Sequence, residues 1–256
     1  MRDELIGPIS QPAAHELAME QIKRCIQLGL FLPGEKLPPE RVLAERLSVS
    51  RSTIREAVRL LQDSGLIEVR RGATGGLVVR DSQVEDPVEL RAWIRRQRAH
   101  LNELMDFRLV IEGAAAELAA CRRTDDDLAR LEAAMQRMEQ CKISDLNRVE
   151  SAQVFNAADT EFHMEIALAA RNSMLAKAVE DIRREMFLPF GGYFIQSRKD
   201  ADIYHRHIFD AIFDRDDERA RAMMQRHIDS TKKAIIAFLE EDAVLLRGSR
   251  DAGAGP

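Results

Sequence analysis

The chain has 256 residues, a length that suits two domains, each with its own hydrophobic core. Apolar residues make up 45% of the sequence and aromatic residues only 5%, which favours a mainly α-helical protein, while the net charge of −5 gives no sign of a nucleic-acid-binding surface over the whole chain. The longest run without a charged residue, 186–197, is shorter than the roughly 18 residues that a membrane span needs. With no apolar signal segment at the N-terminus and three widely spaced cysteines, we expect a cytoplasmic protein that does not bind membranes.

The first predicted element is a helix over residues 12–28. Leu17, Ile22 and Ile26 are among its apolar positions, and Gly29 follows it. We expect this helix to pack behind two shorter helices that follow a turn at 30–34 and a proline pair at 38–39.

The second of these shorter helices carries a cluster of basic and hydroxyl side chains. Ser50 is a suitable N-cap, because its hydroxyl can accept from the free N–H groups of the first helical turn. The apolar side chains recur at i, i+4 and i+7, and the arginines recur every four residues along a neighbouring side. The apolar set is Ile54, Val58 and Leu61, and the basic set is Arg51, Arg55 and Arg59, with Ser52 and Thr53 nearby. Such a helix suits the major groove of DNA, where arginine donates to guanine edges or phosphates and hydroxyls donate to phosphates.

Two short strands are predicted after this helix, at 66–71 and 77–80, around a glycine-rich loop at 72–76. Arg70, Arg71 and Arg80 give this ribbon positive charge. The segment therefore reads as a winged helix-turn-helix; the alternative is an αα-hairpin with a solvated basic face. Residues 1–80 carry 12 Lys and Arg against 10 Asp and Glu, and the remainder carries 26 against 33, which fits a DNA-binding head on an acidic body.

The same segment resembles the DNA-binding domain of the GntR family of bacterial transcription regulators. The matching residues are Leu37-Pro38-Pro39-Glu40-Arg41, Leu43-Ala44, Val49-Ser50-Arg51-Ser52-Thr53-Ile54-Arg55-Glu56-Ala57, Leu60 and Gly65-Leu66-Ile67. The resemblance implies that Arg41, Arg51 and Arg55 contact operator bases or phosphates, and that Ser50, Ser52 and Thr53 hold the phosphate backbone. In the wing, Arg71 would add positive charge and Gly72 would approach the minor groove.

The rest of the chain shows only helical periodicity. We expect a linker at 81–87, an antiparallel all-α bundle of six or seven helices at 88–241, and a disordered tail at 242–256. The predicted helices span 88–98, 101–122, 125–142, 145–170, 173–188, 200–213 and 217–241. Their expected start signals include Asn102, Thr124, Ser144 and Asp214–Asp217.

One carboxylate and three histidines in this bundle could bind a metal. Asp159 and His163 are four residues apart and so lie on one helix face, while His205 and His227 lie on two later helices. Such a set could bind Zn²⁺ or Ni²⁺ and leave positions open for a ligand. Taken singly, however, each histidine is more often a packed or surface residue, and the Asp-x-x-x-His spacing is common by chance.

The bundle also resembles FCD, the effector-binding domain of the FadR-like GntR subgroup. The matching motifs are Arg108-x-x-x-Glu112 with the alanines that follow it, Phe155-x-x-x-Asp159-x-x-Phe162-His163, Arg171-Asn172-x-x-Leu175, His205-x-x-Ile208-x-x-Ala211-Ile212, Asp216-x-x-x-Ala220 and Met224-x-x-His227. In metal-containing members the implied ligands fall on Asp159, His163, His205 and His227, with His205 rather than His207 in the ligand position.

Two further residues are candidates for binding an effector. Arg108 would neutralise a small organic acid or sugar acid coordinated to the metal; the alternative is an i,i+4 ion pair with Glu112. Asn172 would line the pocket, or would cap the helix that follows it.

These features predict a homodimeric, ligand-responsive repressor that binds a pseudo-palindromic operator, because the two-fold symmetry of a dimer is mirrored in its DNA site. One alternative keeps the regulator but gives it a metal-free cavity for a larger ligand such as an acyl-CoA. A second alternative is a metal-dependent hydrolase, against which no convincing general base accompanies the four residues.

Overall fold

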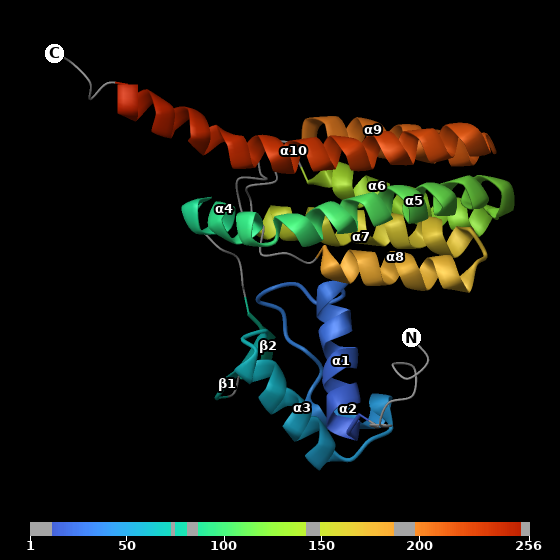
Figure 1. The fold of residues 1–256 in the computed structure, drawn as a ribbon. Coiled ribbons are helices and arrows are strands. Elements are labelled where there is room, and N and C mark those ends of the chain that lie inside the picture. Colours follow the sequence, from blue (N-terminus) through green and yellow to red (C-terminus); the bar gives the residue numbers. More distant parts are fainter. Residues whose placement is uncertain (1–11, 73–74, 81–86, 142–148, 187–197, 252–256) are drawn as a thin grey trace, which may run out of the picture. The chain divides into compact units, whose positions relative to one another are not determined.

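A computed structural model describes residues 12–72, 75–80, 87–141, 149–186 and 198–251 (Figure 1). The chain forms two compact units, 1–82 and 83–256. As the sequence predicts, it is mainly α-helical, with a helix-turn-helix unit that carries a small sheet and an all-helical unit. The predicted linker falls at 81–87, of which residues 81–86 lie outside the described part. None of the described helices is long and apolar enough to cross a membrane.

Within its described residues, the first unit contains three helices and a two-stranded antiparallel sheet. The helices are α1 (Ala14–Gln27), α2 (Glu40–Leu47) and α3 (Arg51–Asp63), and the strands are β1 (Ile67–Arg70) and β2 (Gly76–Val79). Both α1 and α2 pack on α3. The apolar side of α3 predicted from the sequence is buried, and α1 contributes Ile22 and Ile26 to the core, so the opposite face of α3 remains exposed.

The turn between α2 and α3 explains where α3 begins. Ser48 has φ 54°, so the chain leaves α2 in the left-handed conformation that often ends a helix. Ser50 then accepts a hydrogen bond from the backbone N–H of Thr53 through its Oγ, at 3.1 Å. Ser50 is thus the N-cap that the sequence predicts.

The wing is a short hairpin. Ile67 pairs with Val79 and Arg70 with Gly76, and an isolated bridge joins Lys36 to Val78. Gly76 has φ 145°, a conformation that side-chain-bearing residues rarely adopt. Residues 73–74, inside the predicted loop, lie outside the described part.

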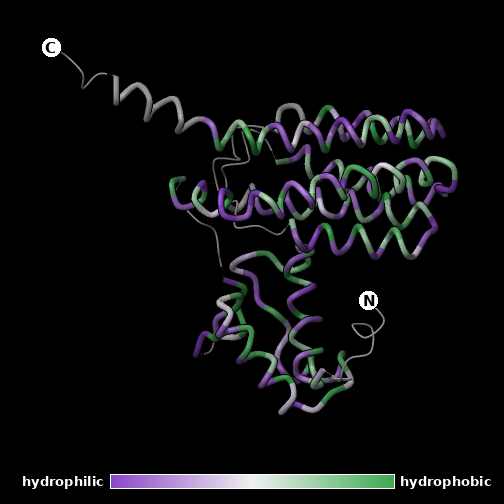
Figure 2. The backbone as a smooth tube through the Cα atoms, in the orientation of Figure 1, coloured by the Kyte–Doolittle hydropathy of each residue, from purple (hydrophilic) through white to green (hydrophobic). Residues whose placement is uncertain are grey.

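The second unit contains seven described helices, in agreement with the predicted six or seven. They are α4 (Pro87–Arg96), α5 (Arg98–Arg122), α6 (Asp125–Gln140), α7 (Val149–Ala169), α8 (Ser173–Glu185), α9 (Arg198–Phe213) and α10 (Asp217–Asp251). The long α5 is central and packs against α7, α8, α9 and α10, while α6 packs against α7 and α9. Along these helices hydrophobic and hydrophilic segments alternate, as expected when one face of each is buried (Figure 2).

The helix α4 is held against α10 by two arginines. Arg91 donates from Nε to the carbonyl of Phe238 at 3.1 Å, and its guanidinium lies 4.6 Å from the centre of the Phe238 ring. Arg95 donates to the carbonyl of Leu239 at 3.2 Å. The first helix after the 81–86 segment is therefore attached to the later part of α10.

Helix boundaries agree with the predicted signals in some places and differ in others. Thr124 caps α6 in a capping box with Asp127. The start signal at Asn102 is wrong, because α5 begins at Arg98 and only Gln97 separates it from α4. The helix α10 continues to Asp251, ten residues past the predicted end, and no glycine or proline occurs between 241 and 247 to stop it. The predicted disordered tail is thus helical as far as 251, and residues 252–256, like the start signal at Ser144, lie outside the described part.

Candidate metal centre and nucleic-acid interface

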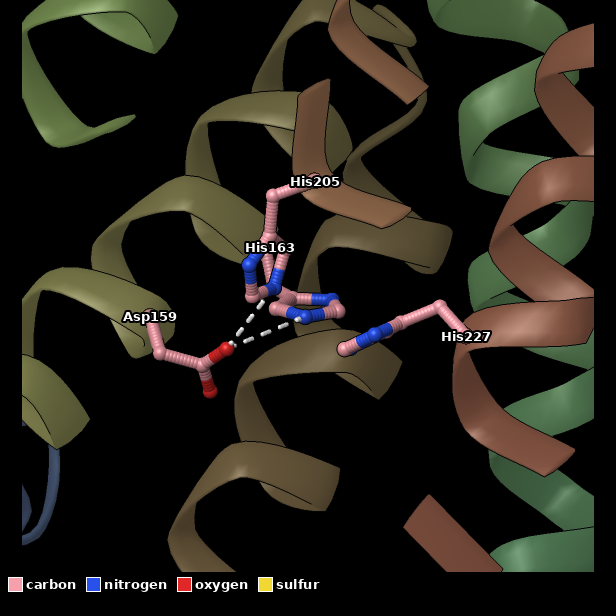
Figure 3. A group of neighbouring side chains, drawn as sticks. All are labelled: Asp159, His163, His205 and His227. Carbon is pink, nitrogen blue, oxygen red and sulfur yellow. Dashed lines mark ion pairs between the residues drawn. The ribbon is translucent and has the colours of Figure 1, made fainter. Parts of the chain in front are cut away.

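Three helices bring the four predicted ligands together inside the helical unit (Figure 3). Asp159 and His163 come from α7, His205 from α9 and His227 from α10. One possible ligand atom from each residue lies within 4.8 Å of the others. The histidines are buried and Asp159 is partly exposed. The exposed residue His207 is not part of this cluster, so His205 is the histidine that α9 contributes.

The carboxylate of Asp159 faces two of the imidazoles with one oxygen. Asp159 Oδ1 lies 3.0 Å from His205 Nε2 and 3.7 Å from His163 Nε2 (dashed lines in Figure 3). The ring centres of His205 and His227 are 4.5 Å apart, and those of His163 and His227 are 5.2 Å apart. The other oxygen, Oδ2, accepts a hydrogen bond from Nη2 of Arg183 on α8, which also donates to Thr160 Oγ1 at 3.0 Å.

A second carboxylate lies behind His163. Oε2 of Glu112 on α5 contacts His163 Nδ1, and Oε1 of Glu112 accepts a hydrogen bond of 2.6 Å from Arg108 Nε. Arg108 and Glu112 are each 1% exposed, so water does not screen this ion pair. Arg108 is also 3.9 Å from the sulfur of Met105.

Burial and neighbouring charges keep the two acids ionised and favour the neutral form of His163 and His227. Burial alone would raise the pKa of Asp159, but Arg183 and the nearby histidines hold it well below its ordinary value. In the same way, Arg108 and His163 outweigh burial and lower the pKa of Glu112. Burial lowers the pKa of His163 despite the opposing effect of Glu112, and burial with two neighbouring histidines lowers the pKa of His227 further.

This donor set fits a divalent metal. Three imidazoles and one carboxylate are nitrogen and oxygen ligands of the kind that Zn²⁺ and Ni²⁺ take in proteins. Both ring nitrogens of His163 and His205, and Nδ1 of His227, are buried and make no hydrogen bond of regular geometry within the described residues, although His163 Nδ1 and His205 Nε2 lie close to the carboxylates of Glu112 and Asp159. Buried nitrogens without partners are costly, and a bound cation is one way in which such a cluster is satisfied.

The two predicted effector residues make other contacts. Arg108 forms the ion pair with Glu112 that the sequence offered as the alternative. Asn172 accepts hydrogen bonds at its Oδ1 from the N–H groups of Met174 and Leu175, and so caps α8. An effector contact of either residue stays an untested prediction.

Sequence reasoning missed Arg183 and assigned Glu112 only to Arg108. Arg183 lies four residues after Val179 and next to Ile182, which places it on the buried face of α8, and a charged residue at a core position is a signal for a buried ion pair. The contact between Glu112 and His163 joins helices far apart in the sequence, so no local pattern could reveal it.

The predicted DNA-binding residues gather at the start of α3, the adjoining α2 and the wing. Arg41, Arg51, Arg55, Arg71 and Gly72 are exposed. The hydroxyl of Ser50 is 2.7 Å from that of Ser52 and 2.8 Å from that of Thr53. Two of the arginines have acidic neighbours: Arg55 pairs with Glu40 at 3.2 Å and Arg41 with Glu45 at 2.6 Å. DNA contacts of these residues remain predictions.

Comparisons with known proteins match both units. Residues 15–76 match the model of the bacterial regulatory proteins of the gntR family, and residues 103–230 match the FCD domain. The chain is 30% identical over 225 residues to the Uxu operon transcriptional regulator of Escherichia coli K12, and the matched region covers 85% of each of the two chains. It is 31% identical over 239 residues to the Exu regulon transcriptional regulator of the same strain, covering 86% of this chain and 84% of that one. A solved structure of E. coli McbR/YncC, 19% identical, covers 91% of this chain and all of that one with a TM-score of 0.50, which supports the fold alone.

Proposed function

This chain belongs to the gntR family of bacterial regulatory proteins and carries an FCD domain, and we propose that the FCD domain binds a divalent metal and, through it, a small organic acid or sugar acid. The protein is a DNA-binding transcription regulator rather than an enzyme. The observation that carries the proposal is the cluster of Asp159, His163, His205 and His227.

The charge balance of the cluster supports an acidic effector. The carboxylates of Asp159 and Glu112 are each paired with a buried arginine, Arg183 and Arg108, and the lowered pKa values of His163 and His227 keep those imidazoles neutral. Among the side chains that would contact a divalent ion in this centre, Asp159 alone is a carboxylate, and it already shares its charge with Arg183, so one negative side chain cannot balance the ion. A bound metal would supply open coordination positions for the carboxylate of an effector.

On the DNA side, we propose that a cytoplasmic homodimer inserts two copies of α3 into adjacent major grooves of a pseudo-palindromic operator. The support is the exposed face of α3, with Arg51 and Arg55 beside Ser52 and Thr53. Repression relieved by the effector requires that the effector bind the DNA-competent and DNA-incompetent arrangements with different affinity. A metal-free cavity for an acyl-CoA is the alternative, but it would leave the buried histidine nitrogens unexplained.

The test is elemental analysis of the purified, tag-free protein beside two double variants. We expect about one Zn or Ni per chain in the parent and none in His163→Ala/His205→Ala. The matched control is His100→Ala/His207→Ala, which removes two exposed histidines and should keep the metal. A parent protein that contains no metal, even after Zn²⁺ or Ni²⁺ is supplied, would contradict the proposed metal site but would not affect the assignment as a transcription regulator.

A further inference from the structure

Two sets of buried, charged side chains contact the histidine cluster from α5 and α8, two helices that provide none of the proposed metal ligands. From α5, Arg108 contacts Glu112, and Glu112 contacts His163. From α8, Arg183 contacts Asp159. The exposed fractions of Arg108, Glu112 and Arg183 are 1%, 1% and 6%, so these charges are placed where water cannot replace a lost partner.

Each of these two sets contacts one atom of a proposed ligand residue, while another atom of the same residue faces the cluster. Glu112 Oε2 meets His163 Nδ1, whereas His163 Nε2 faces Asp159 Oδ1 at 3.7 Å. Arg183 takes Asp159 Oδ2, whereas Oδ1 faces His205 Nε2 at 3.0 Å. In each of these two residues, one atom is therefore held by the outer contact and another faces the cluster.

The contact between Glu112 and His163 bears on which ring nitrogen of His163 can bind a metal. A neutral imidazole carries one hydrogen, and a metal binds the nitrogen without it, so the hydrogen must be on the other nitrogen. A carboxylate such as Glu112 accepts hydrogen bonds and cannot donate one, so its contact favours a hydrogen on His163 Nδ1. That tautomer leaves the lone pair on Nε2, the atom that faces Asp159.

We propose that Glu112 is a positioning residue that fixes His163 in the Nδ1–H tautomer and so presents Nε2 to a metal, with Arg108 holding Glu112 in place and Arg183 orienting Asp159 in the same way. This inference rests on the proposed metal-binding function and concerns residues outside the proposed ligand set. It also gives Arg108 a role different from the effector contact predicted from the sequence. Outer partners of metal-bound histidines have this effect in other proteins, and their loss weakens metal binding by about 10–100-fold.

The decisive variant is Glu112→Gln, and Glu117→Gln is its control. Glu117 lies on the same helix and forms an exposed ion pair with Arg221 on α10 at 2.8 Å, so the control removes an equal charge away from the cluster. Zn²⁺ affinity is measured by competition with a chromophoric chelator, and Co²⁺ replaces Zn²⁺ as a spectroscopic probe. We expect Glu112→Gln to lose about 10–100-fold in Zn²⁺ affinity and to change the Co²⁺ spectrum, while Glu117→Gln matches the parent.

Glu112→Gln leaves Arg108 buried without a charged partner, which can unfold the unit. Arg108→Met/Glu112→Leu removes both charges together and also removes the acceptor for His163, so it should fold and show the same loss of affinity. Zn²⁺ affinity within twofold of the parent in a folded variant would show that Glu112 serves only as the partner of Arg108. A parent that binds neither metal would overturn this inference together with the proposed metal.

A measurement on the unsubstituted protein is independent of variant folding. In the ¹⁵N-histidine spectrum of the metal-free protein, two-bond couplings report which ring nitrogen carries the hydrogen. We expect the hydrogen of His163 on Nδ1. A hydrogen on Nε2 would overturn the positioning role of Glu112 even if the protein binds a metal.

Discussion

The guanidinium of Arg171, which follows α7, lies 2.6 Å from Oδ2 of Asp127 in the first turn of α6. Asp127 is fully buried, and its carboxylate also accepts hydrogen bonds from the N–H and the hydroxyl of Thr124 at 2.8 and 2.9 Å. One carboxylate therefore joins the start of α6 to the turn between α7 and α8. Of these two helices, α7 carries two of the proposed metal ligands and α8 carries Arg183.

Replacing Asp127 should destabilise the helical unit. In Asp127→Asn the side chain can no longer pair with Arg171 and loses its charged hydrogen bonds, so we expect the free energy of unfolding to fall by about 1–3 kcal/mol in urea titrations. Asp126→Asn, which removes the neighbouring exposed carboxylate, should change it by less than about 1 kcal/mol. Equal effects of the two substitutions would show that helix-terminal charge alone is responsible.

The same carboxylate predicts a pH dependence. Burial would raise the pKa of Asp127, but its hydrogen bonds with Thr124 and Arg171 lower it below the ordinary value. A carboxylate with a lowered folded-state pKa contributes stability above its unfolded-state pKa of about 3.9, and this stability is lost as the pH falls through the folded-state pKa. The difference in unfolding free energy between the parent and Asp127→Asn should therefore shrink between pH 5 and pH 3. A constant difference over this range would contradict the assignment.

Two arginines of α3 should matter for DNA and a third should not. Arg51→Ala and Arg55→Ala should each weaken binding to a sequence selected from random duplexes by about 1–3 kcal/mol without unfolding the protein. Arg59 is the control, since its side chain is as exposed as that of Arg55, 66% against 65%, and it also has an acidic neighbour. Fluorescence anisotropy at fixed salt would measure the affinities, and unchanged binding would remove that arginine from the DNA contacts.

The cap of α3 gives a prediction for the head. Ser50→Ala removes the oxygen that accepts from the Thr53 N–H, and we expect a loss of about 1 kcal/mol in the stability of the first unit. Ser52→Ala removes only a hydroxyl neighbour of Ser50 and should be close to neutral. Thermal unfolding followed by circular dichroism compares the two, and similar melting temperatures would refute the cap as the stabilising contact.

The close approach of α5 and α10 predicts a size limit at Gly113. A Cβ there would lie 3.2 Å from Cγ of Gln225, a flexible side chain that can shift, and alanine also favours the helix. Gly113→Ala should therefore change the stability little, whereas Gly113→Leu should destabilise the protein by about 1–3 kcal/mol through overpacking. Urea titration tests both, and equal stability of the two variants would mean that the helices have room to separate.

The sequence predicts local features of this fold better than distant ones. The cap at Ser50 and the helix start at Thr124 follow from residues within one helical turn, and both are confirmed. The predicted end of α10 was wrong, because a polar tail that contains glycine does not by itself stop a helix when the preceding residues favour helix formation. At the site, family motifs were enough to name the four clustered residues. The contacts of Glu112 with His163 and of Arg183 with Asp159 depend on how separate helices pack, which periodicity does not encode.

The contacts between α4 and α10 connect α4 to the helix that carries His227. His227 and Phe238 are eleven residues apart on α10, a rise of about 16 Å along a straight helix axis. At the Phe238 end, Arg91 and Arg95 attach α4, the helix that continues from the segment joining the two units. One continuous helix thus carries a proposed metal ligand and, three turns later, the contacts that attach α4, so an axial displacement of α10 at His227 would also move the attachment point of α4.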